Sequence, residues 1–348
     1  MIFDKIRQWK EERKFEAWKK RYEPLLMPAF LLGGFLLDVF TYKTLQVETT
    51  FEILGAYAAL TALCILFLHM REQRGRLHAA AEFFVQFAFG ALLSQSLLFY
   101  WFSGSASVSW PVLAVVAGLM VSNEAFRAHL QRPFAQVTIF AFVLFSYGSL
   151  LFPFLLNSLD PLVYFVGGVA STAVSLFLVI ILTSLEKLRA RRKLFFSSVL
   201  AVFVAMNALY FGNFIPPIPL SIREAGIYNN VRRVGNEYEL KGSDNSFLGR
   251  LLPWQTINGD EDGRIFAYVA VHAPADLNTV IYHRWERYDT AKKAWVTTDR
   301  FSYAVSGGRE PGYRGYSYKS RVTPGKWRVT VETERGQVLG RLPFTFKP

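Results

Sequence analysis

The sequence is poor in the residues from which metal and redox centres are built. Cys64 is the only cysteine among 348 residues, which excludes an intramolecular disulfide, a thiol redox pair and a cysteine-based zinc site. Two of the five histidines, His272 and His283, lie outside the apolar part of the chain, and two histidines alone do not complete a zinc site. The sequence therefore predicts no cofactor.

Catalytic motifs are also lacking. No serine is flanked by glycines in the way that a nucleophile elbow requires. A hydrolase would have to combine His283 with Asp299 and with Ser302 or Ser317, and no motif connects these residues. We therefore expect a protein that is not an enzyme.

The net charge of +12 does not indicate a nucleic-acid partner. Basic residues in the first half of the chain stand beside apolar stretches, where anionic headgroups attract them. Those in the second half are interspersed with acidic residues, and no motif of a known nucleic-acid reader accompanies them.

Charge is scarce over the middle of the chain, because residues 24–215 are mostly apolar. Stretches of about 20 apolar residues are long enough to cross a bilayer as a helix. They occur at 24–42, 51–70, 80–102, 107–125, 133–156, 161–185 and 194–215. The sequence therefore predicts a multi-pass helical membrane region with about seven spans, which makes the lipid bilayer its first partner.

The loops between these stretches differ in charge. Lys and Arg number eight in residues 1–23, three in 71–78, two in 123–132 and five in 186–193, whereas the alternate loops together contain one lysine. Because short loops rich in Lys and Arg remain in the cytoplasm, we expect the amino terminus there. Seven spans then place the chain after Pro219 outside the cytoplasm.

The first 23 residues carry apolar side chains at helical spacing, beginning with Ile2, Ile6 and Trp9, among many basic residues. This pattern is typical of an amphipathic helix that lies on the membrane surface. The alternative is a segment that fixes topology and has no further role.

Few ionisable side chains lie within the predicted spans, and each is costly there. Asp38 and Glu82, with the polar residues Gln86 and Asn207, form one possible intramembrane polar site for transport. Gln86, with Gly90 and Ser94, repeats every four residues, and small or polar residues at that spacing also pack helices together. Both interpretations stay open at this point.

The chain leaves the last span through a proline-rich stretch, which we assign to a juxtamembrane linker over residues 216–228. Its three prolines cannot continue a helix and favour an extended backbone. We interpret them as a rigid spacer; alternatively they only end the span. The segment SIREAGIY (221–228) within it is compatible with a short surface helix.

Residues 229–348 have the pattern of an all-β, immunoglobulin-like sandwich. Short β-rich runs between turn residues predict strands near 229–234, 237–241, 264–273, 279–288, 294–304, 313–322, 326–333 and 338–346. Trp327, Val329 and Val331 alternate with polar residues, as a half-buried strand requires. We expect Trp285 and Trp327 in the core and Arg328 on the solvated face.

One acidic turn resembles a calcium loop in part. Asn258, Asp260 and Asp262 occupy positions 1, 3 and 5, with Gly263 at position 6. Position 12 is Val269, so the bidentate carboxylate is missing. An ordinary acidic hairpin turn is the simpler hypothesis.

An aromatic and basic edge near the end of the chain is a possible binding surface for a partner protein or an anionic envelope glycan. Its residues are Tyr303, Tyr313, Arg314, Tyr316, Tyr318 and Lys319. The alternative is a set of tyrosines on an ordinary solvated sheet.

Four segments of the second half are similar to a known bacterial membrane-protein family. They are PPIPLSIREAGIY (216–228), HRW (283–285), GYRGYSYKSRV (312–322) and GKWRVTVETERGQVLGRLPFTF (325–346). The family is the one whose carboxy-terminal region is called domain of unknown function twenty-nine fourteen. The resemblance implies a compact extracytoplasmic β domain tethered to membrane helices, and it carries over no catalytic or binding residue.

These observations favour a non-enzymatic integral membrane protein of the bacterial envelope. The helical part would anchor it in the inner membrane, and the periplasmic β domain would bind a partner protein or an envelope polymer. The alternative is a transporter or lipid-handling protein with an accessory β domain. The oligomeric state stays open.

Overall fold

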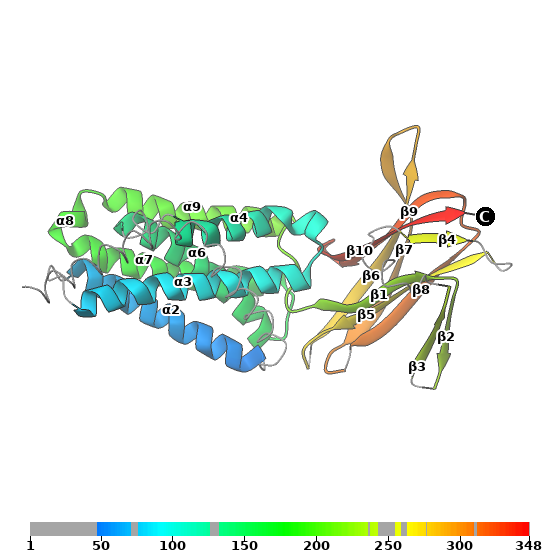
Figure 1. The fold of residues 1–348 in the computed structure, drawn as a ribbon, viewed down its shortest axis with the longest axis horizontal. Helices are drawn as coiled ribbons and strands as arrows, with labels where there is room; N and C mark the ends of the chain where they lie inside the picture. The colour runs from blue at the N-terminus through cyan, green and yellow to red at the C-terminus, as the bar shows by residue number, and fades with distance from the viewer. Residues whose placement is uncertain are drawn as a thin grey trace, which may run out of the picture.

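The computed structural model describes residues 47–70, 76–125, 132–235, 237–242, 255–258, 263–275, 277–309 and 312–347. A helical part and a β part follow one another along the long axis of the molecule (Figure 1). The expected first span (24–42), Asp38 within it and the basic segment 1–23 lie outside the described residues.

The helical part contains α2 (Val47–Met70), α3 (Arg76–Ser103), α4 (Ala106–Ala125), α6 (Pro133–Leu155), α7 (Pro161–Ser184), the short α8 (Glu186–Arg189) and α9 (Arg192–Phe211). In the described part of the chain, six of these helices are long and apolar enough to cross a membrane. They agree within a few residues with the last six spans that hydropathy predicts.

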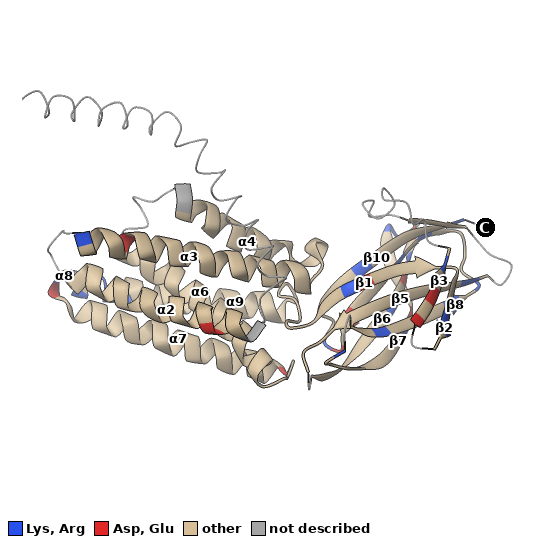
Figure 2. Cartoon of the chain, turned by 60° about the horizontal axis from the view of Figure 1, so that its bottom comes forward, with Lys and Arg blue, Asp and Glu red and all other residues tan. Residues whose placement is uncertain are grey.

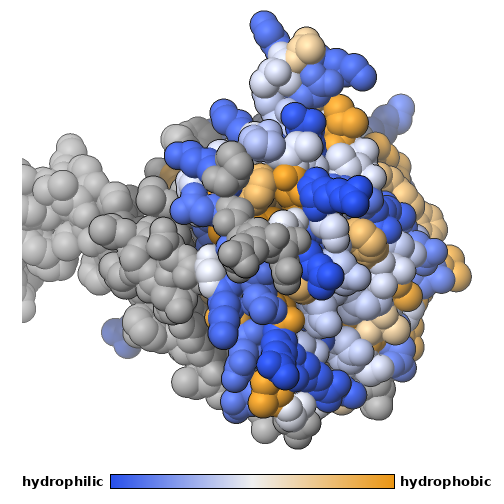
Figure 3. Space-filling model, turned by 90° about the vertical axis from the view of Figure 1, so that its right-hand side faces the viewer, coloured by the Kyte–Doolittle hydropathy of each residue, from blue (hydrophilic) through white to orange (hydrophobic). Residues whose placement is uncertain are grey.

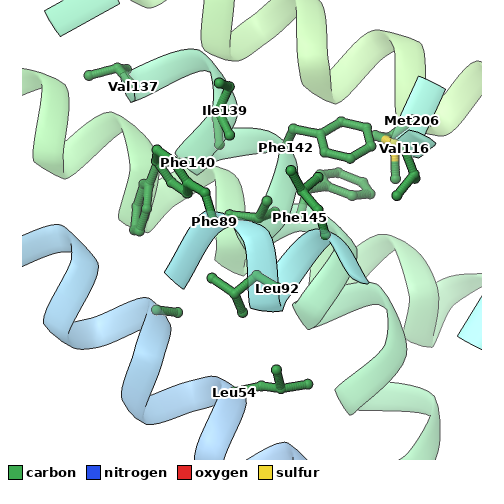
Figure 4. Close-up of a cluster of buried hydrophobic side chains, with 14 of the residues drawn as sticks. Leu54, Phe89, Leu92, Val116, Val137, Ile139, Phe140, Phe142, Phe145 and Met206 are labelled. Atoms are coloured by element: carbon green, nitrogen blue, oxygen red, sulfur yellow. The ribbon is translucent and has the colours of Figure 1, made fainter. Parts of the chain in front are cut away.

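The helices enclose a core that draws side chains from all of the long elements. Figure 4 shows Leu54 of α2, Phe89 of α3 and Phe140 of α6 within one cluster. Because lipid tails are as apolar as these side chains, close packing between helices matters more here than removal of apolar surface from water.

Helices α6 and α7 approach most closely where glycines face each other. A Cβ atom added to Gly167 would lie 2.7 Å from the carbonyl oxygen of Gly148. Ser171 and Ser175, the next residues on this face of α7, are buried and donate to carbonyls of their own helix. This stripe therefore packs helices together.

The charged residues in the described helices are coloured mainly near the two ends of the helical part (Figure 2). The end that carries α8, with Lys187 and Arg189, is the one away from the β part. The basic segment 186–193 and the β domain are thus at opposite ends of the bundle.

The β part contains ten described strands: β1 (Ser221–Tyr228), β2 (Asn230–Val234), β3 (Glu237–Lys241), β4 (Gln255–Asn258), β5 (Arg264–His272), β6 (Asn278–Asp289), β7 (Ala294–Ser306), β8 (Tyr313–Ser320), β9 (Gly325–Thr333) and β10 (Val338–Lys347). One sheet has the order β1-β5-β8, and a second has the order β4-β10-β9-β6-β7. Strands β2 and β3 form a separate hairpin. All pairs are antiparallel except β4 with β10.

The two sheets pack face to face around a shared apolar core. Ile227 and Ile265 from the first sheet meet Trp285, Trp327 and Phe344 from the second. The two tryptophan side chains are 0% and 2% exposed, which confirms the prediction that both belong to the core. The end of the β part farthest from the helices is mostly hydrophilic, with small apolar patches between polar residues (Figure 3).

Two features of the β part differ from the sequence-based expectation. The segment SIREAGIY is strand β1, not a surface helix, because it pairs with β5 along its length and buries Ile227 in the core. The β part therefore begins at Ser221 rather than at residue 229. Strand β4 was not predicted, since its four residues have no alternating pattern and depend on pairing with β10.

The helical and β parts are joined by a short, buried junction. Ile215 and Ile218 belong to the core of the helices, whereas Leu220 belongs to the core of the sandwich. The turn between β9 and β10 also reaches back: the side chain of Gln337 donates to the carbonyl of Ile215 at 3.3 Å, and the guanidinium of Arg335 lies 4.4 Å from the ring centre of Tyr210. The prolines thus lie in a packed junction.

Candidate binding surfaces

The six residues expected to form one binding surface are divided by the structure between two faces. Tyr303 lies on β7 and the other five on β8. Because side chains alternate along a strand, Arg314, Tyr316 and Tyr318 point away from the sandwich interior. Tyr313 and Lys319 point toward β7. The period of two along β8 is a sequence signal that would have separated them.

The outward group forms part of an aromatic face, which we define as Tyr238, Phe266, Tyr316 and Tyr318. The rings of Tyr316 and Tyr318 are 6.0 and 5.5 Å from the ring of Phe266 on β5, and Tyr238 of the hairpin lies 6.1 Å from Tyr316. Tyr316 is 43% exposed and Tyr318 is 50% exposed. Sequence reasoning missed Tyr238 and Phe266, because they join the face only through strand pairing and hairpin packing.

Part of this sheet face is covered. Tyr228 and Tyr268 lie beneath the β2–β3 hairpin and pack against Val231 of β2, and all three side chains are buried. Burial, together with the neighbouring carboxylate of Glu224, raises the pKa of Tyr268 to about 12. The ring of Tyr268 also lies 5.5 Å from the ring of Tyr238, so the covered rings support the aromatic face from below.

Arginines border the exposed rings. The guanidinium of Arg264 lies 6.0 Å from the ring centre of Tyr318, within the range of a cation–π contact. Arg314 stands on the same face of β8 as Tyr316. The surface thus combines rigid aromatic area with positive charge.

Of the six residues, Tyr303 belongs to a buried polar cluster between the sheets, which also contains His283, Trp285 and Ser317. Trp285 Nε1 donates to Ser317 Oγ at 2.9 Å, and Ser317 Oγ lies 2.9 Å from His283 Nδ1. The other ring nitrogen of His283 is 3.3 Å from the hydroxyl of Tyr303. Complete burial lowers the pKa of His283 to about 4, so the imidazole is neutral at neutral pH.

The residues that a hydrolase would need do not come together. His283 is within hydrogen-bond distance of Ser317, but both side chains are buried between the sheets. Ser302 is exposed and pairs across the sheet with Tyr282. Asp299 is paired with Lys319, which holds the pKa of that carboxyl below its usual value.

The outer face of the five-stranded sheet holds an ion-pair network that sequence reasoning missed. Arg328 Nε and Nη2 donate to the two carboxylate oxygens of Glu286 at 2.7 and 2.9 Å. Thr330 also donates to Glu286, and Arg284 pairs with both Glu286 and Glu332. The expectation that Arg328 lies on an ordinary solvated face is therefore wrong, because a buried carboxylate on the neighbouring strand holds its side chain.

The described residues show no arrangement of oxygen ligands that would support the calcium hypothesis. The side chain of Asn258 is exposed at the end of β4, and its backbone carbonyl accepts from Asn229 Nδ2 at 2.9 Å. Asp260 and Asp262 lie outside the described residues. Within the described ranges, no three His, Cys, Asp or Glu side chains are grouped as metal ligands.

The polar residues of the predicted intramembrane site are each bonded locally. Glu82 lies 3.4 Å from His78, one turn before it on α3. The side chains of Gln86 and Asn123 each donate to the other's backbone carbonyl at 3.0 Å, which ties α3 to α4. Asn207 on α9 donates to Phe203 of its own helix. These three described residues do not converge on one site.

Comparison with known protein families finds a match near the end of the chain. Residues 278–346 match the family described as "Protein of unknown function (DUF2914)". The match covers β6 to β10 and confirms the resemblance noted from the sequence. None of the curated proteins matches this sequence.

Three solved structures are similar to parts of the fold. An immunoglobulin-like protein from Pseudomonas aeruginosa has 10% identity and a TM-score of 0.22, over 36% of this chain and 97% of that one. A β-glucosidase from Listeria innocua has 11% identity and a TM-score of 0.22, over 38% and 18%. The alkylpurine DNA glycosylase AlkC from Pseudomonas fluorescens has 9% identity and a TM-score of 0.24, over 86% and 97%. These similarities say nothing of what this chain binds.

Proposed function

We propose that this chain, whose β6 to β10 region carries the DUF2914 sequence behind six candidate membrane helices, is a non-enzymatic, membrane-anchored binding protein of the bacterial envelope. The helices hold it in the inner membrane. The β part binds a partner protein on the periplasmic side through its aromatic face. The envelope-polymer hypothesis is the competing outcome.

The exposure of Tyr316 and Tyr318 on a supported sheet face is the observation that carries this proposal. Tyrosine provides large, rigid contact area at a low cost in conformational entropy, and Tyr and Arg dominate the energy of protein interfaces. Strand β8 also ends its sheet in the order β1-β5-β8. Its outer edge offers backbone groups to which an extended partner segment can bond.

The position of the charges supports the proposed orientation. The α8 end of the bundle, with its basic residues, is opposite the β part, and Lys and Arg are retained on the cytoplasmic side of a membrane. The transporter alternative has less support, because Glu82, Gln86 and Asn207 are bonded within or between neighbouring helices.

The test places a photo-crosslinking residue at position 318 of the full chain in intact cells. We expect one discrete protein adduct, which is lost when Tyr316→Ala is added, because the two rings border the same surface. Position 280 is the matched control: Val280 lies on β6 of the other sheet and is 36% exposed.

Equal adducts at positions 318 and 280 would refute a specific surface. Adducts that disappear on digestion of envelope polysaccharide would show that the surface binds an envelope polymer and not a partner protein. The amount of chain in the membrane fraction is measured for each variant, so that loss of adduct is not confused with loss of protein.

A further inference from the structure

Arginines outnumber carboxylates on the outer face of the five-stranded sheet. Arg341 on β10 is the register partner of Thr330 on β9, and Thr330 is the partner of Arg284 on β6. Arg284 is the partner of Arg300 on β7. Neighbouring strands lie about 4.8 Å apart, so one row across the sheet holds three arginines, and Arg328 lies two residues from Thr330.

Two carboxylates form ion pairs with these arginines, and each already has two arginine partners. Glu332 pairs with Arg284 and Arg300, whereas Glu286 pairs with Arg284 and Arg328. The exposed fraction of the Glu side chains is 5% and 3%. Among the described residues, no carboxylate lies within ion-pair distance of Arg341. Four guanidinium groups are therefore balanced by two carboxylates.

Arg341 occupies a partly buried position in this group. Its Nη1 donates to the hydroxyl of Ser107 at 3.2 Å, and its Nε is enclosed without a hydrogen-bond partner in the described structure. Burial lowers the pKa of its guanidinium, and the positive charges of Arg328 and Arg284 add to this effect, which the two glutamate carboxylates only partly oppose. Positive charge without a partner in a half-buried site is unfavourable, and a bound anion would relieve it.

Arg341 lies where the β part meets the helical part. Ser107 belongs to the first turn of α4, at the end of the helical part that meets the β part. If the long helices cross a bilayer, this end lies at the level of the lipid headgroups. Arg341 therefore adjoins the layer in which lipid phosphates lie, and the other arginines extend from it across the sheet.

We propose that Arg341, together with Arg284, Arg328 and Ser107, forms a binding site for a phosphate group where the β part meets the membrane surface. A planar guanidinium matches the oxygen atoms of phosphate with two parallel hydrogen bonds. The phosphate belongs to an anionic lipid headgroup or to free phosphate. The site lies on the sheet opposite the aromatic face, so it does not depend on the proposed partner surface, but it rests on the proposed anchoring of the helices in a membrane.

The test measures lipid retention by native mass spectrometry of the full chain in detergent. We expect phosphatidylglycerol to be retained more than phosphatidylcholine, because the phosphatidylglycerol headgroup carries no cation to oppose the arginines. Arg341→Gln should weaken phosphatidylglycerol binding by about tenfold or more, the effect of losing one charge-assisted bond. Ser107→Ala, at an exposed position, should weaken it to a smaller extent.

Arg287→Gln is the charge-matched control, because Arg287 is exposed on β6 and takes no part in the row. Inorganic phosphate added at millimolar concentration distinguishes the sources: displacement of the lipid assigns the site to free phosphate, and no displacement assigns it to the headgroup. Unchanged lipid retention in both Arg341→Gln and Ser107→Ala would overturn the proposal. Equal losses of lipid binding in Arg287→Gln and Arg341→Gln would overturn the proposal too, since the lipid would then be held by general electrostatic attraction and not by a site at Arg341.

Discussion

Trp327 and Arg328 are neighbours on β9, yet each is held by a different environment. Trp327 is buried between the sheets, and its Nε1 donates to the carbonyl of Thr323 at 2.8 Å. Arg328 lies on the other face, over the ring of Trp295 at 4.4 Å and in contact with both oxygens of Glu286. Because successive side chains of a strand point to opposite faces of the sheet, Trp327 makes apolar contacts whereas Arg328 makes ionic ones.

Trp327→Ala should destabilise the β part by about 3–5 kcal/mol, because it removes a large aromatic side chain from a closed core. The measurement is amide hydrogen exchange of β6 and β9 in the full chain, which reports the local free energy of opening. A change below about 1 kcal/mol would mean that the core closes over the lost ring.

Arg328→Ala should cost about 1.5–3 kcal/mol in the same measurement, since it leaves the buried Glu286 with fewer donors. The side chain of Glu286 is 3% exposed, so water cannot replace the lost bonds. Arg287→Ala, at an exposed position on β6, is the control and should change stability by less than about 0.5 kcal/mol. Equal effects of the two substitutions would contradict the ionic role of Arg328.

His283 should make the stability of the β part depend on pH. Its pKa is about 4 in the folded chain, against an ordinary value of 6.5. The unfolded chain therefore binds the proton more readily, and stability falls as the pH drops from about 6.5 toward 4. The full loss is about 3 kcal/mol.

Hydrogen exchange of β6 at pH 7 and pH 5, corrected for the intrinsic rate, measures this effect. His283→Gln should remove most of the difference, because it removes the titrating group. Glu286 and Asp299, whose pKa values are lowered, lose their contribution only at more acidic pH. A pH dependence that survives in His283→Gln would assign it to another group.

At the scale of elements, the crossing of α6 and α7 depends on the absence of side chains. Gly148 and Gly167 bring the two backbones together, and a Cβ atom on either would lie under 3.0 Å from the carbonyl oxygen of the other. Such small residues allow helices to pack in a membrane without a hydrophobic driving force. The crossing is therefore sensitive to any added volume.

Gly167→Leu should separate α6 from α7 and lower the midpoint of thermal unfolding of the helical part by several degrees. Gly118→Leu on α4 is the matched control, because no atom lies within 4 Å of the added Cβ. Cys64, as the only cysteine in the chain, reports the transition through its reaction with a thiol-specific dye. Equal midpoints for the two variants would show that the crossing tolerates a separation of the helices.

At the scale of the whole molecule, the junction keeps the β part close to the helices. The carbonyl of Arg335 accepts from Asn213, and Gln337 donates to Ile215. Pro216 packs against the α3–α4 loop, where a Cβ atom on Gly104 would lie 2.6 Å from its side chain. The β domain therefore presents its surfaces at a fixed place relative to the bundle.

A phosphatase reporter fused after Pro348 should be active, and one fused after Arg192 should be inactive. The physical reason is that basic residues such as Lys187 and Arg189 hold the α8 end in the cytoplasm, while the β part lies at the other end. The measurement is reporter activity normalised to the amount of fusion protein. The opposite pattern would mean that the chain is inverted in the membrane.

The sequence by itself determined the helical part and most of the sandwich strands. Hydropathy depends on runs of consecutive residues, and eight strands, including the alternation around Trp327, were visible in local patterns. The family relationship of residues 278–346 was likewise visible in linear motifs.

Only the tertiary structure decided which side chains meet. Strand β4 exists because β10 pairs with it, and Phe266 joins Tyr316 and Tyr318 from another strand. Glu286 and Arg328 are 42 positions apart in the sequence, and Ser107 and Arg341 are 234 apart. Hydropathy and periodicity are properties of at most about 20 consecutive residues, whereas these contacts depend on strand register and on how two domains pack. No local pattern could therefore have revealed them.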